Sequence, residues 1–366
     1  MKTIINREDI LGPLQNVIGA VERRQTLPIL GNILLRSSDG VLTITATDLE
    51  IEMVAQVKAQ EADNFQTTIP ARKLLDICKA LPEECSIQFD IEENKVTLHS
   101  GRSRFALASL PANEFPGLDD INPQQSFSIP QKQLKELFDS TAFAMAQQDV
   151  RYYLNGILVE LSTDNIKLVA TDGHRLALSE YQTDIGISTD KQIIIPRKGV
   201  IEISRLLENS ESPAEITLSQ NHIRIKIDSL TFTSKLIDGK FPEYKRVIPV
   251  DGNRIIEVSR EALKQTLNRI AILSNEKYRG IRLILSSNNL SIQANNPDQE
   301  EAEEELTVEY NDADMEIGFN VTYLIDVLNV LDSDKVLVKL KDANSSCIIS
   351  DNNESNSLYV VMPMRL

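Results

Sequence analysis

The sequence is poor in the residues on which metal sites, disulfide frameworks and large aromatic cores depend. Its 366 residues include no Trp, an aromatic fraction of 5%, and only three Cys and three His. The cysteines, Cys78, Cys85 and Cys347, form no CxxC pair, and no His lies near them at the spacing of a zinc site. We therefore expect free thiols in a reducing compartment, no metal and no other cofactor.

Signals for a membrane or secretory destination are also missing. No apolar run approaches the roughly 18 residues of a membrane span. The first residues, MKTIINREDILG, carry charges at Arg7, Glu8 and Asp9, which interrupt the apolar segment that a signal peptide needs. We expect a cytoplasmic protein.

Catalytic motifs are absent as well, with no GxSxG, GxxxxGK[ST], HExxH or GxGxxG. One segment, ATDGHRLAL (170–178), places His174 between Asp172 and Arg175. A hydrolase built on His174 and Asp172 would also need an activated nucleophile and an oxyanion hole. We therefore predict that the protein is not an enzyme, and that this segment is a surface turn that frames a pocket, with the hydrolase as the alternative.

The chain contains one pattern three times. A short strand followed by a helix is predicted in TIINREDILGPLQNVIGAV (3–21), FSIPQKQLKELFDSTAFAM (127–145) and IIEVSREALKQTLNRIAIL (255–273). A second helix is predicted in TIPARKLLDICKAL (68–81), IIPRKGVIEISRLL (194–207) and IGFNVTYLIDVLNVL (317–331). Asp48, Asp172 and Asn296 end similar strands at intervals of 124 residues, which predicts that each forms a turn.

A period of this size is the length of a domain. Many short segments alternate between apolar and polar residues, which is typical of half-buried antiparallel strands. The sequence therefore predicts an α+β fold with three tandem copies of one domain, each with two helices on antiparallel sheet, near 1–125, 126–250 and 251–366.

The charge is distributed unevenly. The chain has a net charge of −16, yet the expected helices hold 16 Lys and Arg against 10 Asp and Glu over 7–24, 71–82, 130–145, 196–207, 259–279 and 321–331. Basic helices on an acidic protein favour weak contact with phosphates without sequence specificity, although solvated helix faces would show the same pattern. Two such chains joined head to tail would form a ring of twelve helices around a hole of order 28 Å, wide enough for duplex DNA.

Long blocks of the sequence resemble one known family. They are TLPILGN (26–32), QDVRYYLNG (148–156), ATDGHRLA (170–177), PRKGV (196–200), FTSKLIDGKFPEY (232–244), AILSNEKYRG (271–280), ANNPDQEEAEE (294–304) and YVVMPMRL (359–366). The chain is similar over its whole length to the bacterial DNA polymerase III beta subunit, the sliding clamp. The resemblance implies a homodimeric ring of six domains that encircles double-stranded DNA, without sequence preference and without catalysis. Such a ring confers processivity by tethering the polymerase catalytic subunit, and it binds the clamp loader and other proteins that carry a clamp-binding peptide.

The resemblance also implies residue roles. The partner-peptide groove maps to Leu154, Thr171, Gly173, His174, Arg175, Leu176, Pro242, Arg246, Val247, Asn320, Tyr323, Ser346, Val360, Val361, Met362, Pro363, Met364, Arg365 and Leu366. DNA contacts map to Arg24, Arg72, Gln148, Tyr152, Tyr153, Arg197, Lys198, Arg205 and Tyr278. The dimer interface maps to Lys73, Arg102, Arg104, Phe105, Leu107, Ile272, Leu273, Glu300, Glu301, Glu303 and Glu304.

One position departs from the family pattern, because Asn344 stands where a small apolar residue is expected in the groove. A monomeric peptide-binding scaffold without a DNA role is the other alternative. Sedimentation separates the two, since the clamp requires a dimer.

Overall fold

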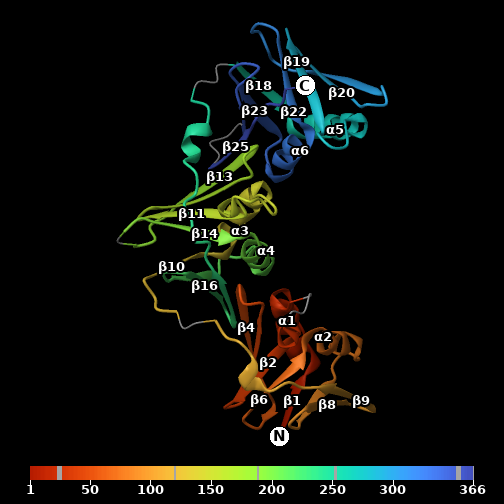
Figure 1. Cartoon of the computed structure of the whole chain (residues 1–366), viewed down its shortest axis with the longest axis vertical. Coiled ribbons are helices and arrows are strands. Elements are labelled where there is room, and N and C mark those ends of the chain that lie inside the picture. The colour runs from red at the N-terminus through yellow and green to blue at the C-terminus, as the bar shows by residue number, and fades with distance from the viewer. Residues whose placement is uncertain (23–26, 119–120, 188, 251–253, 352–355, 366) are drawn as a thin grey trace. The chain divides into compact units, whose positions relative to one another are not determined.

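The computed structural model describes residues 1–22, 27–118, 121–187, 189–250, 254–351 and 356–365 (Figure 1). Two compact units account for the chain. The first comprises Met1–Leu134 with Lys198–Leu236, and the second comprises Lys135–Arg197 with Ile237–Leu366. The division runs through the middle of the expected second domain, so the three domain boundaries stay a prediction here.

The α-helices in the described part of the chain are those that the sequence predicts. They are α1 (Arg7–Val17), α2 (Ala71–Ala80), α3 (Gln131–Thr141), α4 (Arg197–Leu206), α5 (Arg260–Ile270) and α6 (Val321–Val330). Short 3₁₀ turns extend three of them, namely η1 (Ile18–Ala20), η4 (Ala142–Ala144) and η7 (Ala271–Leu273). Further 3₁₀ turns are η2 (Pro28–Gly31), η3 (Ala112–Glu114), η5 (Tyr152–Leu154) and η6 (Tyr244–Val247).

Helices α1 and α5 are shorter than predicted. The expected helix over 7–24 ends as α1 at Val17 and is followed by the turn η1. The sequence suggests a helix over 259–279, but α5 ends at Ile270 and the chain turns at Asn275, whose Oδ1 accepts the N–H groups of Lys277 and Tyr278 at 3.0 Å each. At the other end, Ser259 Oγ caps α5 by accepting the N–H of Ala262 at 3.3 Å. With the observed bounds, the helices keep 12 Lys and Arg against 8 Asp and Glu.

The first unit contains two antiparallel sheets. The smaller has the order β5-β1-β7-β8-β9, formed by β1 (Lys2–Asn6), β5 (Glu61–Ala62), β7 (Ser86–Ile91), β8 (Lys95–Ser100) and β9 (Ser103–Ala108). The larger has the order β10-β15-β16-β17-β4-β3-β2-β6. Its strands are β2 (Asn32–Ser38), β3 (Val41–Thr47), β4 (Ile51–Lys58), β6 (Phe65–Pro70), β10 (Gln125–Pro130), β15 (Pro213–Leu218), β16 (His222–Ile227) and β17 (Leu230–Lys235).

The second unit repeats this arrangement. Its larger sheet has the order β14-β11-β12-β13-β25-β24-β23-β18. The strands are β11 (Gly156–Ser162), β12 (Asn165–Thr171), β13 (Arg175–Gln182), β14 (Lys191–Pro196), β18 (Arg254–Ser259), β23 (Lys335–Leu340), β24 (Cys347–Asp351) and β25 (Ser357–Val361). The smaller sheet, β21-β20-β19-β22, is formed by β19 (Gly280–Ser286), β20 (Asn289–Asn295), β21 (Glu301–Thr307) and β22 (Met315–Asn320).

Each large sheet joins strands of two neighbouring repeats. In the first unit, β4 of the first repeat pairs with β17 of the middle repeat, with Ile51 opposite Ser234. In the second unit, β13 of the middle repeat pairs with β25 of the third, with Arg175 opposite Val361. We call these pairings the first and second junctions.

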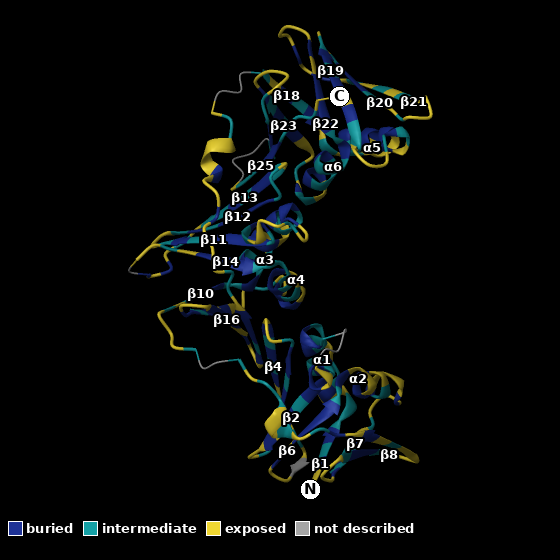
Figure 2. Cartoon of the chain, viewed as in Figure 1, coloured by how far each residue is buried: buried dark blue, intermediate teal, exposed yellow. Residues whose placement is uncertain are grey.

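The core lies between the helices and the sheets (Figure 2). Alternate strand residues face it, as in β3, where Leu42, Ile44 and Ala46 are buried and the residues between them are partly exposed. Helix α2 contributes an apolar stripe that includes Leu74 and Cys78. Two helices on antiparallel sheet in each repeat confirm the predicted α+β fold. Within the described residues, no helix has the length and apolarity that a bilayer crossing requires.

Candidate functional site

A turn between β12 and β13 accounts for the ATDGHRLAL segment. Asp172 Oδ1 accepts hydrogen bonds from the N–H groups of His174 (2.9 Å) and Arg175 (3.0 Å). Thr171 Oγ1 accepts the N–H of Gly173 at 3.1 Å, and Gly173 has a φ of 90°, a conformation that favours glycine. These contacts confirm the prediction that Asp172 forms a turn.

The other two repeats also contain an Asx turn, which is one residue longer in the third repeat. Asp48 Oδ1 accepts the N–H groups two and three positions on, at 2.9 and 2.8 Å. Asn296 Oδ1 accepts those two and four positions on, at 3.0 Å each. The interval of 124 residues therefore marks a structural repeat, and any chemistry specific to the middle repeat has to come from the residues around its turn.

Arg175 is such a residue, and its guanidinium is fully engaged. It donates to Asp172 Oδ2 (3.1 Å), to Asp326 Oδ2 of α6 (2.5 Å) and to the carbonyl oxygen of Phe143 (2.8 Å). It also lies over the ring of Tyr323, 4.6 Å from the ring centroid. Because its side chain is 11% exposed, Arg175 anchors β13 to α6 instead of presenting a free charge to a ligand.

His174 lies on the surface beside this anchor. Its ring is nearly parallel to that of Tyr323, with centroids 6.3 Å apart, and its carbonyl oxygen accepts the N–H of Met362 at 2.9 Å. The Asp172 carboxylate is occupied by the turn and by Arg175, so it is not available to orient the imidazole as in a catalytic triad. The geometry gives the hydrolase alternative no support.

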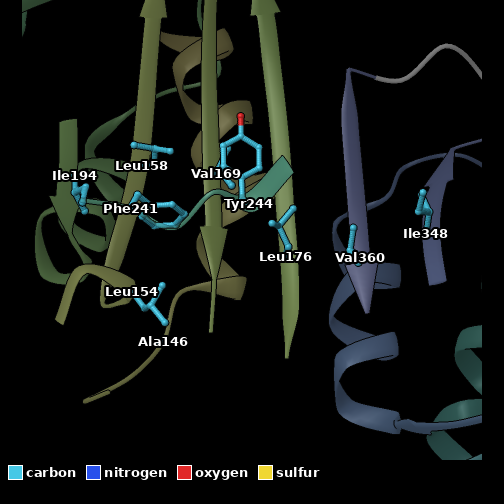
Figure 3. Close-up of a cluster of buried hydrophobic side chains, with 10 residues drawn as sticks. All are labelled: Ala146, Leu154, Leu158, Val169, Leu176, Ile194, Phe241, Tyr244, Ile348 and Val360. Carbon is cyan, nitrogen blue, oxygen red and sulfur yellow. The ribbon is translucent and has the colours of Figure 1, made fainter. Parts of the chain in front are cut away.

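Buried apolar side chains form a cluster that includes three predicted groove residues (Figure 3). The cluster consists of Ala146, Leu154, Leu158, Val169, Leu176, Ile194, Phe241, Tyr244, Ile348 and Val360. Leu154, Leu176 and Val360 are predicted groove residues, but they are only 1–2% exposed. Pairing of β13 with β25 packs Leu176 against Val360, so these side chains support the surface from below.

A pocket of about 390 Å³ lies at one side of this cluster, lined by Leu158, Glu160, Gln192 and the segment 240–246. Tyr244 Oη donates to Glu160 at 2.7 Å, and Gln192 Nε2 donates to the same carboxylate at 2.7 Å. Burial, together with Glu160, raises the pKa of Tyr244, which keeps this phenol protonated. The predicted groove residues Pro242 and Arg246 belong to this lining.

The remaining predicted groove residues are spread over the surface and the chain end. Pro242, Arg246, Val247 and Arg365 are exposed, Tyr323, Asn320, Ser346, Met362, Pro363 and Met364 are partly exposed, and Val361 is buried. Asn320 Oδ1 caps α6 by accepting the N–H of Thr322 at 2.9 Å. Leu366 lies outside the described residues, and Asn344 is exposed.

Several predicted DNA contacts are free to meet a ligand. Arg72, Gln148, Tyr152 and Tyr278 are exposed, with 57% of Tyr152 and 55% of Tyr278 open to solvent. Tyr153 is partly covered and packs edge-on against Tyr152, with ring centroids 5.8 Å apart. Arg24 lies outside the described residues.

Three of the predicted DNA contacts are instead held by the protein. Lys198 pairs with the carboxylate of Asp48, whose side chain is 3% exposed. Arg205 donates to two carbonyl oxygens in the last turn of α1, at 3.3 and 2.7 Å. Arg197 Nη1 donates to the carbonyl oxygen of Met145 at 3.3 Å. These contacts connect α4 to neighbouring elements, although the side chains of Lys198 and Arg205 are still 36% and 42% exposed.

Most of the predicted dimer residues lie in or beside two edge strands, whereas Lys73 lies in α2 and Ile272 and Leu273 lie in η7. Among the described strands, β9 pairs only with β8, and β21 pairs only with β20. The charged residues Lys73, Arg102, Arg104, Glu300, Glu301 and Glu303 are exposed. The apolar ones are Phe105 and Leu273, which are partly exposed, Leu107, which is 9% exposed, and Ile272, which is 76% exposed.

Glu304 differs from the other acidic residues of β21. Its carboxylate accepts Arg269 Nε at 2.9 Å and Thr266 Oγ1 at 3.0 Å, both from α5 of the same chain. The hydrogen bond from Arg269 lowers the pKa of Glu304. Glu303 also accepts hydrogen bonds within the domain, from Ser291 Oγ at 2.9 Å and from Gln293 Nε2 at 2.7 Å. Glu304 differs in being held by a cation, which makes it the least available of the predicted interface carboxylates.

Sequence reasoning missed the partners that complete these sites. Phe143 and Asp326 hold Arg175, and Glu160 binds Tyr244 across 84 positions of sequence. Only Tyr244 has a signal, because it closes the FPEY block. Among the described residues, no three His, Cys, Asp or Glu side chains are placed to hold a metal ion.

Comparisons with known proteins agree over the whole chain. The three domains of the DNA polymerase III beta subunit family match in order, the N-terminal domain at residues 1–119, the central domain at 128–243 and the C-terminal domain at 245–365. The beta sliding clamps of Pseudomonas aeruginosa and Escherichia coli K12 are 52% and 49% identical over 367 residues, with 100% of both chains covered.

Solved structures give the same result. The DNA polymerase III subunit beta of P. aeruginosa is 51% identical and superimposes with a TM-score of 0.97 over 100% of both chains. A sliding clamp of Bartonella birtlesii bound to griselimycin is 37% identical, also with a TM-score of 0.97 over 100% of both chains. The chain belongs to the DNA polymerase III beta subunit family, the bacterial beta sliding clamps.

Proposed function

We propose that this chain, a DNA sliding clamp and non-catalytic subunit of a DNA polymerase, works as a head-to-tail homodimer. In this dimer, β9 of one subunit pairs with β21 of the other and closes the ring. The observation that carries the proposal is the likeness of the two junctions. In each, the strand after the Asx turn pairs with the last strand of the next repeat. Among the described strands, β21 and β9 are the corresponding strands left without this partner.

The junctions also predict the register of this third pairing, which we call the seam. In both junctions, the residue whose N–H closes the Asx turn lies opposite the fifth residue of the incoming strand: Ile51 opposite Ser234, and Arg175 opposite Val361. In the seam, the corresponding residues are Glu300 of β21's turn and Leu107 of β9. Counting along the antiparallel strands then places Ala302 opposite Phe105 and Glu303 opposite Arg104.

This register suits the chemistry of the two edges. Glu303 and Arg104 are both exposed and carry opposite charges. Ala302 and Phe105 are partly exposed apolar side chains that would cover each other. Opposite charges around a small apolar centre favour one register and disfavour pairing of like edges.

A disulfide trap tests the seam. Ala302→Cys with Phe105→Cys should give a covalent dimer of about 82 kDa, twice 41.0 kDa, on a non-reducing gel after mild oxidation. The control combines Ala302→Cys with Ser103→Cys, two positions out of register, and should crosslink poorly. Cys78 and Cys347 are buried, and the partly exposed Cys85 is replaced by Ser in both pairs of variants to remove its background reaction. A wild-type chain that sediments as a 41.0 kDa monomer at micromolar concentration would sink the proposal.

For the DNA site, we propose that the exposed residues Gln148, Tyr152 and Tyr278 make direct contacts, since aromatic faces stack on sugars and bases without sequence preference. Lys198, Arg197 and Arg205 support α4 and add positive potential. On nicked circular DNA with a clamp loader and ATP, the protein should stay bound in high salt and leave once the circle is linearised. Equal loss from circular and linear DNA would contradict topological binding.

For the partner site, we propose that peptides of the polymerase catalytic subunit, the clamp loader and other proteins dock around His174, Pro242, Arg246, Val247 and the tail 362–365. The exposed and partly exposed side chains there offer apolar contact and a few polar anchors. The buried Leu154, Leu176 and Val360 shape the floor. A His174→Ala variant should weaken peptide binding in a fluorescence anisotropy titration while leaving dimer formation unchanged.

The domain boundaries and the location complete the proposal. We assign the three clamp domains to 1–125, 126–250 and 251–366, in line with the three family matches. The free cysteines suit a reducing cytoplasm, which is where we place the protein.

A further inference from the structure

Three of the proposed peptide contacts lie on one segment between β17 and β18. Pro242, Arg246 and Val247 belong to residues 237–250, which we call the connector, and all three side chains are exposed. The connector contains no strand and only the short turn η6. Within the described part of the chain, the backbone of 238–250 forms hydrogen bonds only inside the connector. Its position on the sheet therefore depends on side chains.

Apolar side chains attach the connector at several points. After the N–H of Ile237 donates to the carbonyl oxygen of Ile194 at 2.9 Å, the chain leaves β14 and crosses the sheet. Phe241 and Tyr244 are 7% and 5% exposed and belong to the buried cluster, and Ile248 packs against it (Figure 3). The exposed groove residues therefore lie directly beside buried anchors of the same segment.

One polar contact joins the connector to the sheet. Tyr244 Oη donates to Glu160 Oε2 at 2.7 Å, and Gln192 Nε2 donates to the other oxygen, Oε1, at 2.7 Å. Glu160 in β11 and Gln192 in β14 lie opposite each other, so two neighbouring strands fix the carboxylate. Among the described residues, no cation pairs with Glu160. Because its charge is met by neutral donors, the hydrogen bond from Tyr244 is of the stronger, charge-assisted kind.

The pocket of about 390 Å³ lies beside this contact, lined by Leu158, Glu160, Gln192 and 240–246. Apolar packing around Tyr244 ends at the pocket, so on this side the hydrogen bond holds the connector to the sheet. Tyr244 is also the first residue of η6, the turn that ends at Val247. The placement of its ring and hydroxyl therefore sets the direction of the turn that carries Arg246 and Val247.

We propose that the hydrogen bond from Tyr244 to Glu160 is a positioning contact for partner binding. It holds the connector in the conformation in which Pro242, Arg246 and Val247 meet the peptide. Without it, only a fraction of the molecules would have the connector docked, and the apparent dissociation constant of the peptide would rise by the inverse of that fraction. The family resemblance places neither Tyr244 nor Glu160 in the groove. The proposal rests on the partner site proposed above.

Stopped-flow anisotropy tests it with a fluorescein-labelled peptide that carries the clamp-binding segment of the polymerase catalytic subunit. Tyr244→Phe keeps the ring and removes the hydroxyl, and it should raise the dissociation constant roughly five- to tenfold. The change should appear as slower association, because fewer molecules are ready to bind, whereas loss of a direct contact such as His174 should speed dissociation.

Two variants of the acceptor follow the same bond. Glu160→Ala should match Tyr244→Phe, and the double variant should be no weaker than either single one, because all three remove the same contact. Glu160→Gln should bind within roughly twofold of wild type. Its amide oxygen still accepts the Tyr244 hydroxyl, and Gln192 can turn its own amide to accept the new N–H.

Tyr310→Phe is the matched control. Tyr310 belongs to the same unit, is 2% exposed, and donates its hydroxyl to the carbonyl oxygen of Ala313 at 2.6 Å. It is neither a groove residue nor part of the connector. Its loss should lower the melting temperature about as much as Tyr244→Phe, because both variants remove a hydrogen bond of a buried tyrosine, yet peptide association should stay at the wild-type rate.

The outcomes separate the possible failures. If Tyr310→Phe weakens peptide binding as much as Tyr244→Phe, the effect is a general loss of stability and the positioning role is wrong. The role is also wrong if Tyr244→Phe binds like wild type, if it changes only the dissociation rate, or if the double variant is as weak as the product of the two. If the wild-type chain does not bind the peptide, the partner site itself fails, and that result is visible before any variant is made.

Discussion

Replacing Arg175 with Met should destabilise the second unit more than any other single loss of a positive charge near the turn. Arg175→Met keeps the apolar stem but leaves Asp172 and Asp326 without their cation. Loss of one partner from a buried pair costs about 3–5 kcal/mol. The two carboxylates are 17% and 30% exposed, so water can relieve part of the cost, and we expect about 2–3 kcal/mol.

Scanning calorimetry at fixed protein concentration measures this effect. A loss of that size should lower the midpoint of the transition by roughly 4–12 °C for a unit of this length. Protein concentration has to be matched, because dimer formation shifts the midpoint by mass action. Arg151→Met is the control, since Arg151 bonds Asp149 and the carbonyl oxygen of Asp172 with a side chain that is 48% exposed.

The control should lose less than about 1 kcal/mol, as exposed ion pairs do. Adding Asp172→Asn and Asp326→Asn to Arg175→Met should recover part of the loss, because no unpaired carboxylate then remains. The reasoning fails if Arg175→Met is no more harmful than Arg151→Met, or if the triple variant is less stable than Arg175→Met alone.

Three further results are expected. Gly156→Ala should lower the free energy of unfolding in urea by about 1–3 kcal/mol, because the new Cβ would lie 2.4 Å from the carbonyl oxygen of Ile195. Gly12→Ala in α1 has nothing within 4 Å of the new Cβ and should raise that free energy by up to about 1 kcal/mol; equal effects of the two variants would refute this. Cys85 should react with a thiol reagent well before Cys78 and Cys347, because burial raises the pKa of those two thiols to about 12; simultaneous labelling in the folded protein would contradict it. Since Arg269 lowers the pKa of Glu304 in the folded chain, the stability that this pair contributes is present above the unfolded-state pKa and is lost as pH falls. The difference in melting temperature between wild type and Glu304→Gln should therefore shrink from about pH 6 to pH 3, and a constant difference would argue against this reasoning.

Local features of the fold could be predicted from the sequence because they depend on local periodicity. Apolar spacing identified α2 and α4 to within two residues. The same spacing overestimated α5, where Asn275 closes a turn that no apolar pattern encodes. The interval between Asp48 and Asp172 identified the shared turn because an Asx side chain bonds residues only two or three positions away.

The site residues were harder to predict because their partners lie far away in sequence. Lys198 meets Asp48 across 150 positions, and Arg205 meets the last turn of α1 across 189 and 190. From sequence alone, a basic residue near a helix end is equally consistent with a DNA contact and with an ion pair or hydrogen bond between repeats. Only the three-dimensional structure shows that Lys198 and Arg205 connect neighbouring repeats, while Tyr152 and Tyr278 remain exposed.

The three Asx turns share a hydrogen-bonding pattern but hold different side chains. At Asp48, Asp172 and Asn296 alike, Oδ1 accepts the N–H two positions on, although the third turn is one residue longer. The second side-chain atom differs, and so does the group that it holds: Lys198 at the first junction, Arg175 at the second and Glu300 at the third turn. A permanent contact within the chain is served by a buried carboxylate. At the third turn the Asx residue is neutral and the charged Glu300 is exposed, so a contact made there can be broken without leaving a charge buried.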